Sequence, residues 1–98
     1  MKRALVMDPN DNVGNALDDI LAGDVFEFEI GGSVKQIKAT DEIPFGFKVA
    51  VADIKKSGSI LKYNQPVGVA SEDIKAGECV HIHNVEGARG RGDQEAIA

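Results

Sequence analysis

A cysteine and two histidines alternate along a short run near the end of the chain, in the sequence ECVHIHN. Because side chains on a strand alternate between its two faces, we expect Val80 and Ile82 to enter the core. The outward face would then carry Cys79, His81 and His83. Thiols and imidazoles bind zinc or iron, and an imidazole also transfers protons near neutral pH.

One strand supplies at most three metal ligands, and the chain has no second group of Cys or His. We therefore assign no metal ligand. Three interpretations stay open for this strand: ordinary surface histidines, a site that another protein completes, and a metal site within this chain.

A lysine follows a predicted turn in the sequence DEIPFGFKVA. Pro44 and Gly46 are typical of a tight turn between extended segments, and Lys48 comes just after it. The segment is either a structural turn or a loop that presents Phe47 and Lys48 to a ligand. In the second case Lys48 would contact a carboxylate.

The sequence DPNDN, from Asp8 to Asn12, has oxygen-bearing side chains at the spacing of the first positions of a calcium loop. The glycine comes one place late, at Gly14, and the twelfth position is Asp19 rather than glutamate. We therefore predict a turn after the first strand rather than a calcium site.

The sequence ends in GARGRGDQEAIA, with Arg89 and Arg91 in a frame of glycines. We predict one domain over residues 1–86 and a flexible tail or linker toward a large catalytic subunit over residues 87–98. Such a tail stays unfolded or becomes ordered on a partner, and the arginines could then bind a carboxylate.

The segments that position these groups are typical of short strands. In DVFEFEIGGSVKQIKAT, apolar and charged residues alternate and Gly31–Gly32 is suited to a two-residue turn, so we predict a hairpin with Phe26 opposite Ile37. No segment keeps an apolar stripe of helical period for three turns, although NALDDILAG could form one short helix. The predicted class is mainly β.

A weak repeat, Ala-x-x-Asp-Ile followed by Gly, occurs three times, beginning at Ala16, Ala50 and Ala70. We interpret each copy as a strand, one helical or 3₁₀ turn that ends at a glycine with positive φ, and a second strand. The uneven spacing of the copies argues against a solenoid and favours a loop-rich β domain.

The composition excludes two classes of partner. With 11 basic and 16 acidic residues in 98, the net charge is -5, which is the wrong sign for a protein that neutralises nucleic-acid phosphates. No apolar run is long enough to span a bilayer. The sequence has one cysteine and no export signal, so we expect a cytoplasmic protein.

Four segments, taken in order, resemble one enzyme family: DNVGNALDDILAGD, DEIPFGFKVA, KYNQPVGVASEDIKAGECVHIHN and EGARGRGD. They are similar to the small N-terminal domain of the altronate and galactarate dehydratases, from about Leu5 to Asp93. The resemblance implies a small SAF-type domain with a β-clip fold, short strands and one-turn helices. The chain departs from that family at Phe47, where a histidine commonly precedes the lysine.

In that family the small domain either precedes a larger catalytic region or is a separate subunit. This chain ends soon after the Arg-Gly-Arg-Gly-Asp segment, so we expect a small subunit or a detached domain that works with a large catalytic dehydratase subunit. The implied reaction removes water from altronate or a similar sugar acid and gives a 2-keto-3-deoxy acid. The resemblance also implies a divalent metal, Fe²⁺ or Mn²⁺, in the large subunit and none bound by this chain alone.

The resemblance implies roles for individual residues. We expect His81 or His83 to donate a proton or to orient the substrate, and Lys48 to contact its carboxylate. Asn84 would either fix the end of the strand or bind a substrate hydroxyl. Two alternatives are the small subunit of a sulfolactate sulfo-lyase and a non-catalytic SAF-type module that binds a ligand or serves assembly.

Overall fold

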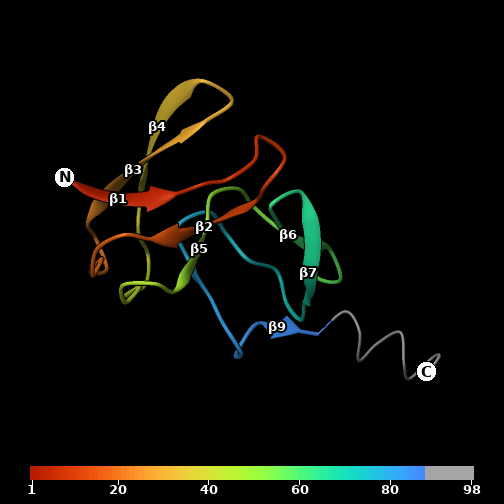
Figure 1. The fold of residues 1–98 in the computed structure, drawn as a ribbon. Helices are drawn as coiled ribbons and strands as arrows, with labels where there is room; N and C mark the ends of the chain where they lie inside the picture. The colour runs from red at the N-terminus through yellow and green to blue at the C-terminus, as the bar shows by residue number, and fades with distance from the viewer. Residues whose placement is uncertain (88–98) are drawn as a thin grey trace.

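The computed structural model describes residues 1–87, and these form nine short strands in two sheets (Figure 1). The strands are β1 (Lys2–Leu5), β2 (Val13–Ala16), β3 (Val25–Ile30), β4 (Ser33–Lys38), β5 (Lys48–Ala50), β6 (Ser59–Lys62), β7 (Gln65–Ala70), β8 (Cys79–Val80) and β9 (Val85–Glu86). One sheet has the order β4-β3-β1-β2-β5-β8, and the other has the order β6-β7-β9. The prediction of a mainly β fold is confirmed.

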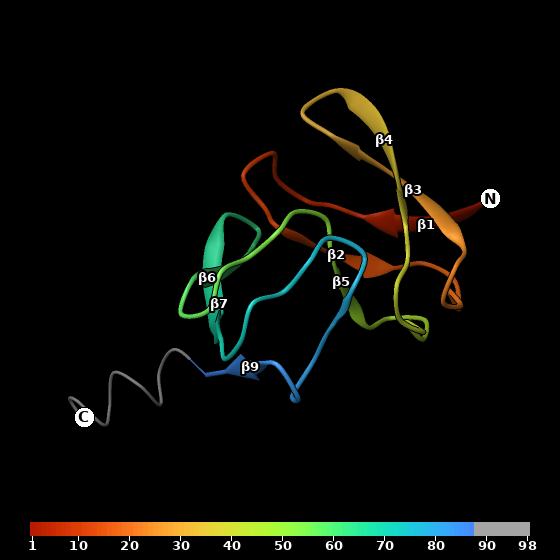
Figure 2. The same ribbon diagram turned by 180° about the vertical axis from the view of Figure 1, so that it is seen from behind.

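The two hairpins lie at opposite ends of the molecule. In both ribbon views β3 and β4 form one end, while β6, β7 and β9 form the other (Figures 1 and 2). Strand β5 and the segment that leads to β9 run between these ends. Strands β5 and β8 are at the edge of the larger sheet opposite to β4.

The β3–β4 hairpin has the predicted register. Phe26 lies opposite Ile37, and the turn residues Gly31 and Gly32 have φ values of 58° and 84°. Two consecutive positive φ values are typical of the two-residue turns that match the twist of a hairpin, and glycine adopts them without steric cost. Local turn chemistry and alternation were thus sufficient to predict this element.

The Ala-x-x-Asp-Ile repeat has a fourth copy that the sequence analysis missed. Residues 39–46, ATDEIPFG, carry Ala39, Ile43 and Gly46 at the same spacing, with Glu42 in place of the aspartate. The isoleucines of the four copies pair in two isolated β-bridges. Copies 16–23 and 39–46 interlock in one pair, and copies 50–58 and 70–77 interlock in the other.

Backbone hydrogen bonds hold each interlocked pair together. The N–H of Ile20 donates to the carbonyl of Ile43 at 2.9 Å, and the reverse bond is 2.7 Å. Ile54 and Ile74 exchange the same two bonds at 2.8 and 2.7 Å. In every copy the third residue after the isoleucine has a positive φ and donates its N–H to the alanine carbonyl of the paired copy: Gly23 to Ala39, Gly46 to Ala16, Ser57 to Ala70 and Gly77 to Ala50.

The predicted one-turn helices are wrong, because residues 1–87 contain no helix. In NALDDILAG, Ala16 ends strand β2 and Ile20 forms a bridge with Ile43. Those long-range backbone bonds use the groups that a helix would pair internally. The same residues also include no helix long and apolar enough to cross a membrane.

The buried hydrophobic residues form two core clusters. The first is built around Phe26, Phe28 and the Ile20–Ile43 bridge, and it includes Cys79. The second is built around Ile60 and the Ile54–Ile74 bridge, and it includes Val80. Strand β8 therefore lies between two cores.

The aspartates of the repeat fasten the interlocked loops. The Oδ1 atom of Asp73 accepts the N–H of Lys56 at 2.8 Å, and Asp53 accepts the N–H of Ala76 at 2.9 Å. We expect Asp73→Ala to lower the free energy of unfolding by about 0.5–1.5 kcal/mol, because a backbone donor loses its partner. Urea denaturation followed by circular dichroism would measure this loss in the free energy of unfolding. The neighbouring exposed Glu72 provides the control, and an equal loss in Glu72→Ala would contradict this role.

Candidate functional site

The histidines lie on a turn rather than on a strand. Strand β8 ends at Val80, and His81 to Asn84 form a turn in which the N–H of Asn84 donates to the carbonyl of His81 at 3.1 Å. The prediction that Ile82 enters the core is wrong, because its side chain is 84% exposed. The strand is too short to carry the alternation past Val80.

The Asn84 side chain shapes this turn. It is buried, its Oδ1 accepts the N–H of His81 at 3.0 Å, and its Nδ2 donates to the carbonyl of Cys79 at 2.9 Å. Both ends of the amide are therefore used within the chain. Of the two predicted roles, these contacts favour fixing the strand end over binding a substrate hydroxyl.

Cys79 does not face outward, contrary to the prediction, because the second core covers one face of β8 and the first covers the other. Burial raises the pKa of the Cys79 thiol, and the nearby Asp41 carboxylate raises that pKa further. Asp41 is fixed there by accepting the N–H of Cys79 at 3.0 Å. The thiolate that a nucleophile or a metal ligand requires is thus disfavoured.

The turn at Pro44 to Gly46 forms as predicted and brings Phe47 to His81. The N–H of Phe47 donates to the carbonyl of Pro44 at 2.9 Å, and Gly46 has a φ of 87°. The rings of Phe47 and His81 stack with centroids 4.5 Å apart and planes inclined by 33°. Two segments far apart in the sequence thus meet at a specific side-chain contact.

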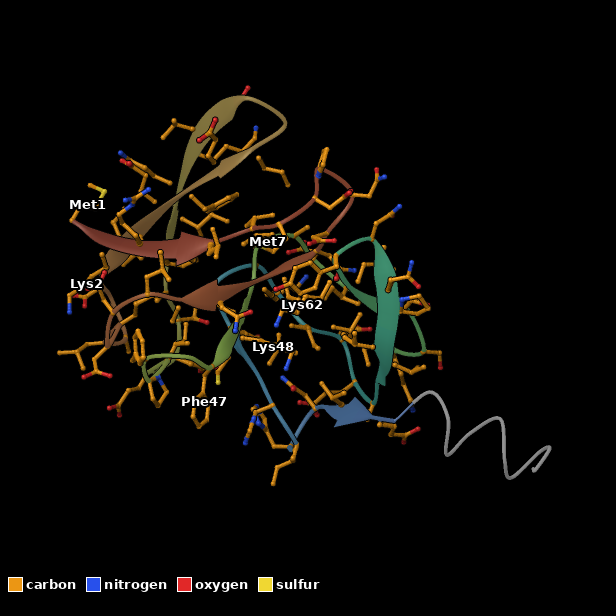
Figure 3. The ribbon with its side chains drawn as sticks, in the orientation of Figure 1. Met1, Lys2, Met7, Phe47, Lys48 and Lys62 are labelled. Carbon is orange, nitrogen blue, oxygen red and sulfur yellow. The ribbon has the colours of Figure 1, made fainter. Side chains whose placement is uncertain are left out.

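Lys48 and His81 share a hollow of about 340 Å³. Lys48, which Figure 3 labels near Phe47, begins β5. It pairs with Val80 on β8, directly before His81. The other lining residues offer apolar side chains or none: Ile60, Val67, Val80, Ile82, Val85 and Gly87. Both histidines are exposed, but only His81 lines the hollow, so the structure separates the two predicted histidines.

The lining of this hollow favours an anion. Among residues 1–87, Lys48 is the only formally charged side chain that lines it, and none of these residues adds a carboxylate to the lining, although the full sequence carries a net charge of -5. A lysine ammonium is a three-donor cation, and a neighbouring imidazole can donate or accept a proton. A small carboxylate could therefore bind to Lys48 with the imidazole of His81 beside it.

Arg89 and Arg91, the arginines predicted to bind a carboxylate, lie outside the described residues. They follow Gly87, which lines the hollow, by two and four positions. The predicted tail, residues 87–98, lies outside them too except for Gly87. Its boundary with the domain at residue 86 stays a prediction.

The residues described here do not form a metal centre. No three His, Cys, Asp or Glu side chains within residues 1–87 lie close enough together to hold an ion. Around the hollow, the only nitrogen or sulfur ligand among the lining residues is His81. The divalent metal that the family resemblance implies was expected in the large subunit, and that expectation stays a prediction.

The loop DPNDN is a structural turn, as predicted. Asp8 accepts the N–H of Asn10 at 2.9 Å, and the Asp11 carboxylate accepts the N–H groups of Tyr63 and Asn64 at 2.9 and 2.7 Å. Tyr63 and Asn64 have positive φ values in the turn between β6 and β7. Asp11 is buried and holds this distant turn, and with it the β6–β7 wall of the hollow, a role that no local sequence pattern indicates.

The fold is that of a small, mainly β domain with a hollow between the β5–β8 edge of its larger sheet and the smaller sheet. A sequence model of the altronate/galactarate dehydratase SAF domain matches residues 2–88. The chain therefore belongs to the family of SAF domains found in altronate and galactarate dehydratases.

Characterised relatives agree with that family. An altronate dehydratase from Bacillus subtilis (strain 168) is 38% identical over 86 residues, which are 88% of this chain and 16% of that enzyme. One from Escherichia coli (strain K12) is 36% identical over 74 residues, 76% of this chain and 14% of that enzyme. The chain thus spans a small fraction of the altronate dehydratases that it matches.

A second kind of relative is a separate subunit. The alpha subunit of (2R)-sulfolactate sulfo-lyase from Chromohalobacter salexigens is 37% identical over 54 residues, which are 55% of this chain and 57% of that subunit. Since 54 residues make up more than half of it, that subunit is itself a short chain. One kind of relative is thus named as an altronate dehydratase, and the other as a subunit of a (2R)-sulfolactate sulfo-lyase.

Proposed function

We propose that this chain supplies the carboxylate-binding edge of a sugar-acid dehydratase whose remaining active-site groups belong to a larger catalytic region. The observation that carries the proposal is the hollow that Lys48 and His81 both line, and whose other described lining residues are apolar or glycine. A substrate such as altronate would place its carboxylate against Lys48.

The hollow is suited to one end of such a substrate. Apart from Lys48 and His81, the lining residues that the structure describes offer no polar side chain, whereas each sugar hydroxyl requires a hydrogen-bond partner when it is buried. The hydroxyl-bearing end would therefore contact the catalytic region. This requirement is consistent with the small share, 16%, of the Bacillus subtilis enzyme that this chain matches.

The proposed chemistry is a β-elimination. A base of the catalytic region removes the proton next to the carboxylate, and Lys48 stabilises the negative charge that develops on the enediolate. The C–O bond to the β-hydroxyl then breaks while protonated His81 donates a proton to the departing oxygen, so that water leaves. The resulting enol tautomerises to a 2-keto-3-deoxy acid.

The divalent metal stays an expectation for the large catalytic region. Fe²⁺ or Mn²⁺ there would act as a Lewis acid toward substrate oxygens. The roles proposed for Lys48 and His81 are those of a cationic contact and a proton donor, and neither step is assigned to the metal.

A chimeric enzyme would test the proposal. In this chimera, residues 2–88 of the chain replace the matching segment of the Bacillus subtilis altronate dehydratase. We expect Lys48→Met to lower kcat/KM for altronate about 10–100-fold, since a hydrogen bond between charged groups is lost. The control is Lys35→Met, because β4 and the β5–β8 pair lie at opposite edges of the sheet. Equal kcat/KM values for the two variants would contradict the role of Lys48.

A second candidate function rests on the sulfo-lyase relative. Its alpha subunit is a short separate chain, and sulfolactate, like altronate, is a hydroxy acid with a carboxylate for Lys48. Co-expression of this chain with the protein encoded beside it would distinguish the two functions. Sulfite release from sulfolactate would support the sulfo-lyase, and 2-keto acid release from altronate would support the dehydratase.

A further inference from the structure

The imidazole of His81 makes no hydrogen bond to any residue in the part of the chain that the structure describes. Its backbone N–H is bound by Asn84, but the ring itself has one specific contact, the stack on Phe47. A histidine that transfers protons is usually held in place by a hydrogen bond from one ring nitrogen to a third group. In the described residues, the phenyl ring of Phe47 takes the place of such a hydrogen-bonding group.

Phe47 is itself held firmly. It is half-buried and packs against the first core cluster, which is the one that contains Phe26 and Phe28. Its N–H donates to the carbonyl of Pro44, and its own carbonyl accepts the N–H of Ala16, both at 2.9 Å. The ring is therefore a fixed surface for the imidazole, and it does not line the hollow.

From these contacts we infer that Phe47 is a positioning residue: its ring fixes the orientation of the His81 imidazole at the edge of the hollow and leaves both ring nitrogens free. This inference rests on the proposed function of His81. Aromatic stacking restricts the tilt of a ring without occupying its hydrogen-bonding edge. Both nitrogens of His81 thus remain available to the substrate and to groups of the catalytic region.

The first test is a structural one on the full chain. Nuclear magnetic resonance would record the contacts between the two rings and the ring-current shift of the His81 ring protons in the original chain, Phe47→Leu and Phe47→Tyr. Leucine retains an apolar side chain but has no ring face, whereas tyrosine retains the ring. We expect Phe47→Leu to lose the shift and Phe47→Tyr to keep it. An unchanged His81 environment in Phe47→Leu would overturn the inference.

The second test measures turnover by the chimera. We expect Phe47→Leu to lower kcat for altronate about 10–100-fold with little change in KM, because a small misplacement of a reacting group has effects of this size. Phe47→Tyr, which retains the ring, should keep the kcat of the original chimera. Phe45→Leu is the control, because Phe45 lies in the same turn but is 65% exposed.

The two tests separate failure of this inference from failure of the proposed function. If Phe47→Leu frees the His81 ring but kcat is unchanged while His81→Gln is inactive, then the orientation is not important and the inference is wrong. If His81→Gln also keeps full activity, then the proposed function of His81 fails as well, and Phe47 has no proton donor to position.

Discussion

Replacing His81 with glutamine in the chimera is expected to lower kcat for altronate about 10²–10⁴-fold, the size typical of losing a general acid. Glutamine retains a hydrogen-bonding side chain of similar length but cannot supply a proton. His81 is the histidine that lines the hollow with Lys48, so its loss removes the proton that the departing hydroxyl requires.

His83→Gln is the matched control, because His83 lies in the same turn, is exposed and does not line the hollow. We expect its kcat to stay within about threefold of the original chimera, since it is not expected to contact the reacting atoms. Circular dichroism would establish that both variants fold. Loss of turnover in His83→Gln with full turnover in His81→Gln would reverse the assignment of the two histidines.

Replacing Gly77 with alanine is expected to lower the free energy of unfolding by about 2–5 kcal/mol. Gly77 has a φ of 97°, and a Cβ atom there would lie 2.5 Å from the carbonyl oxygen of Lys38. A side chain at positive φ costs about 1–2 kcal/mol, and the overpacking adds about 1–3 kcal/mol. The strain would arise two residues before β8, which carries the histidine turn.

Gly23→Ala provides the control for this effect. Gly23 occupies the equivalent position of another repeat copy with a φ of 93°, but nothing lies within 4 Å of an added Cβ. Only the conformational cost of about 1–2 kcal/mol is then expected. Urea denaturation of both variants would measure the difference. If Gly77→Ala were no less stable than Gly23→Ala, the close approach of the Lys38 carbonyl would not matter for stability.

Elements set by local chemistry were predictable from the sequence. The β3–β4 hairpin follows from its alternation and its Gly-Gly turn, and the turn before Lys48 follows from Pro44 and Gly46. The loop DPNDN was also recognised as a turn. In each case the residues that determine the conformation lie within the element itself.

Features set by distant partners were not predictable. The expected helix at NALDDILAG gives way to a bridge between Ile20 and Ile43, which are 23 positions apart. Cys79 is buried because two core clusters enclose β8, and no local pattern reveals the second one. The fourth repeat copy, ATDEIPFG, does not match the Ala-x-x-Asp-Ile pattern because Glu42 stands in place of the aspartate.

The candidate site was predictable in its members but not in its arrangement. Lys48 and His81 were recognised from residue type and family resemblance, yet only the fold shows that they share a hollow. The ring contact between Phe47 and His81 joins segments 34 positions apart, and the sequence analysis could not choose between His81 and His83.

The most direct test of the account is the formation of 2-keto-3-deoxy acid from altronate by the chimera, measured with the original segment and with Lys48→Met and His81→Gln combined. We predict product with the original segment and none above background with the double variant, although both chimeras fold. A folded chimera that makes no product with the original segment, or equal product with both segments, would contradict the proposal that this chain supplies the carboxylate-binding edge of a dehydratase.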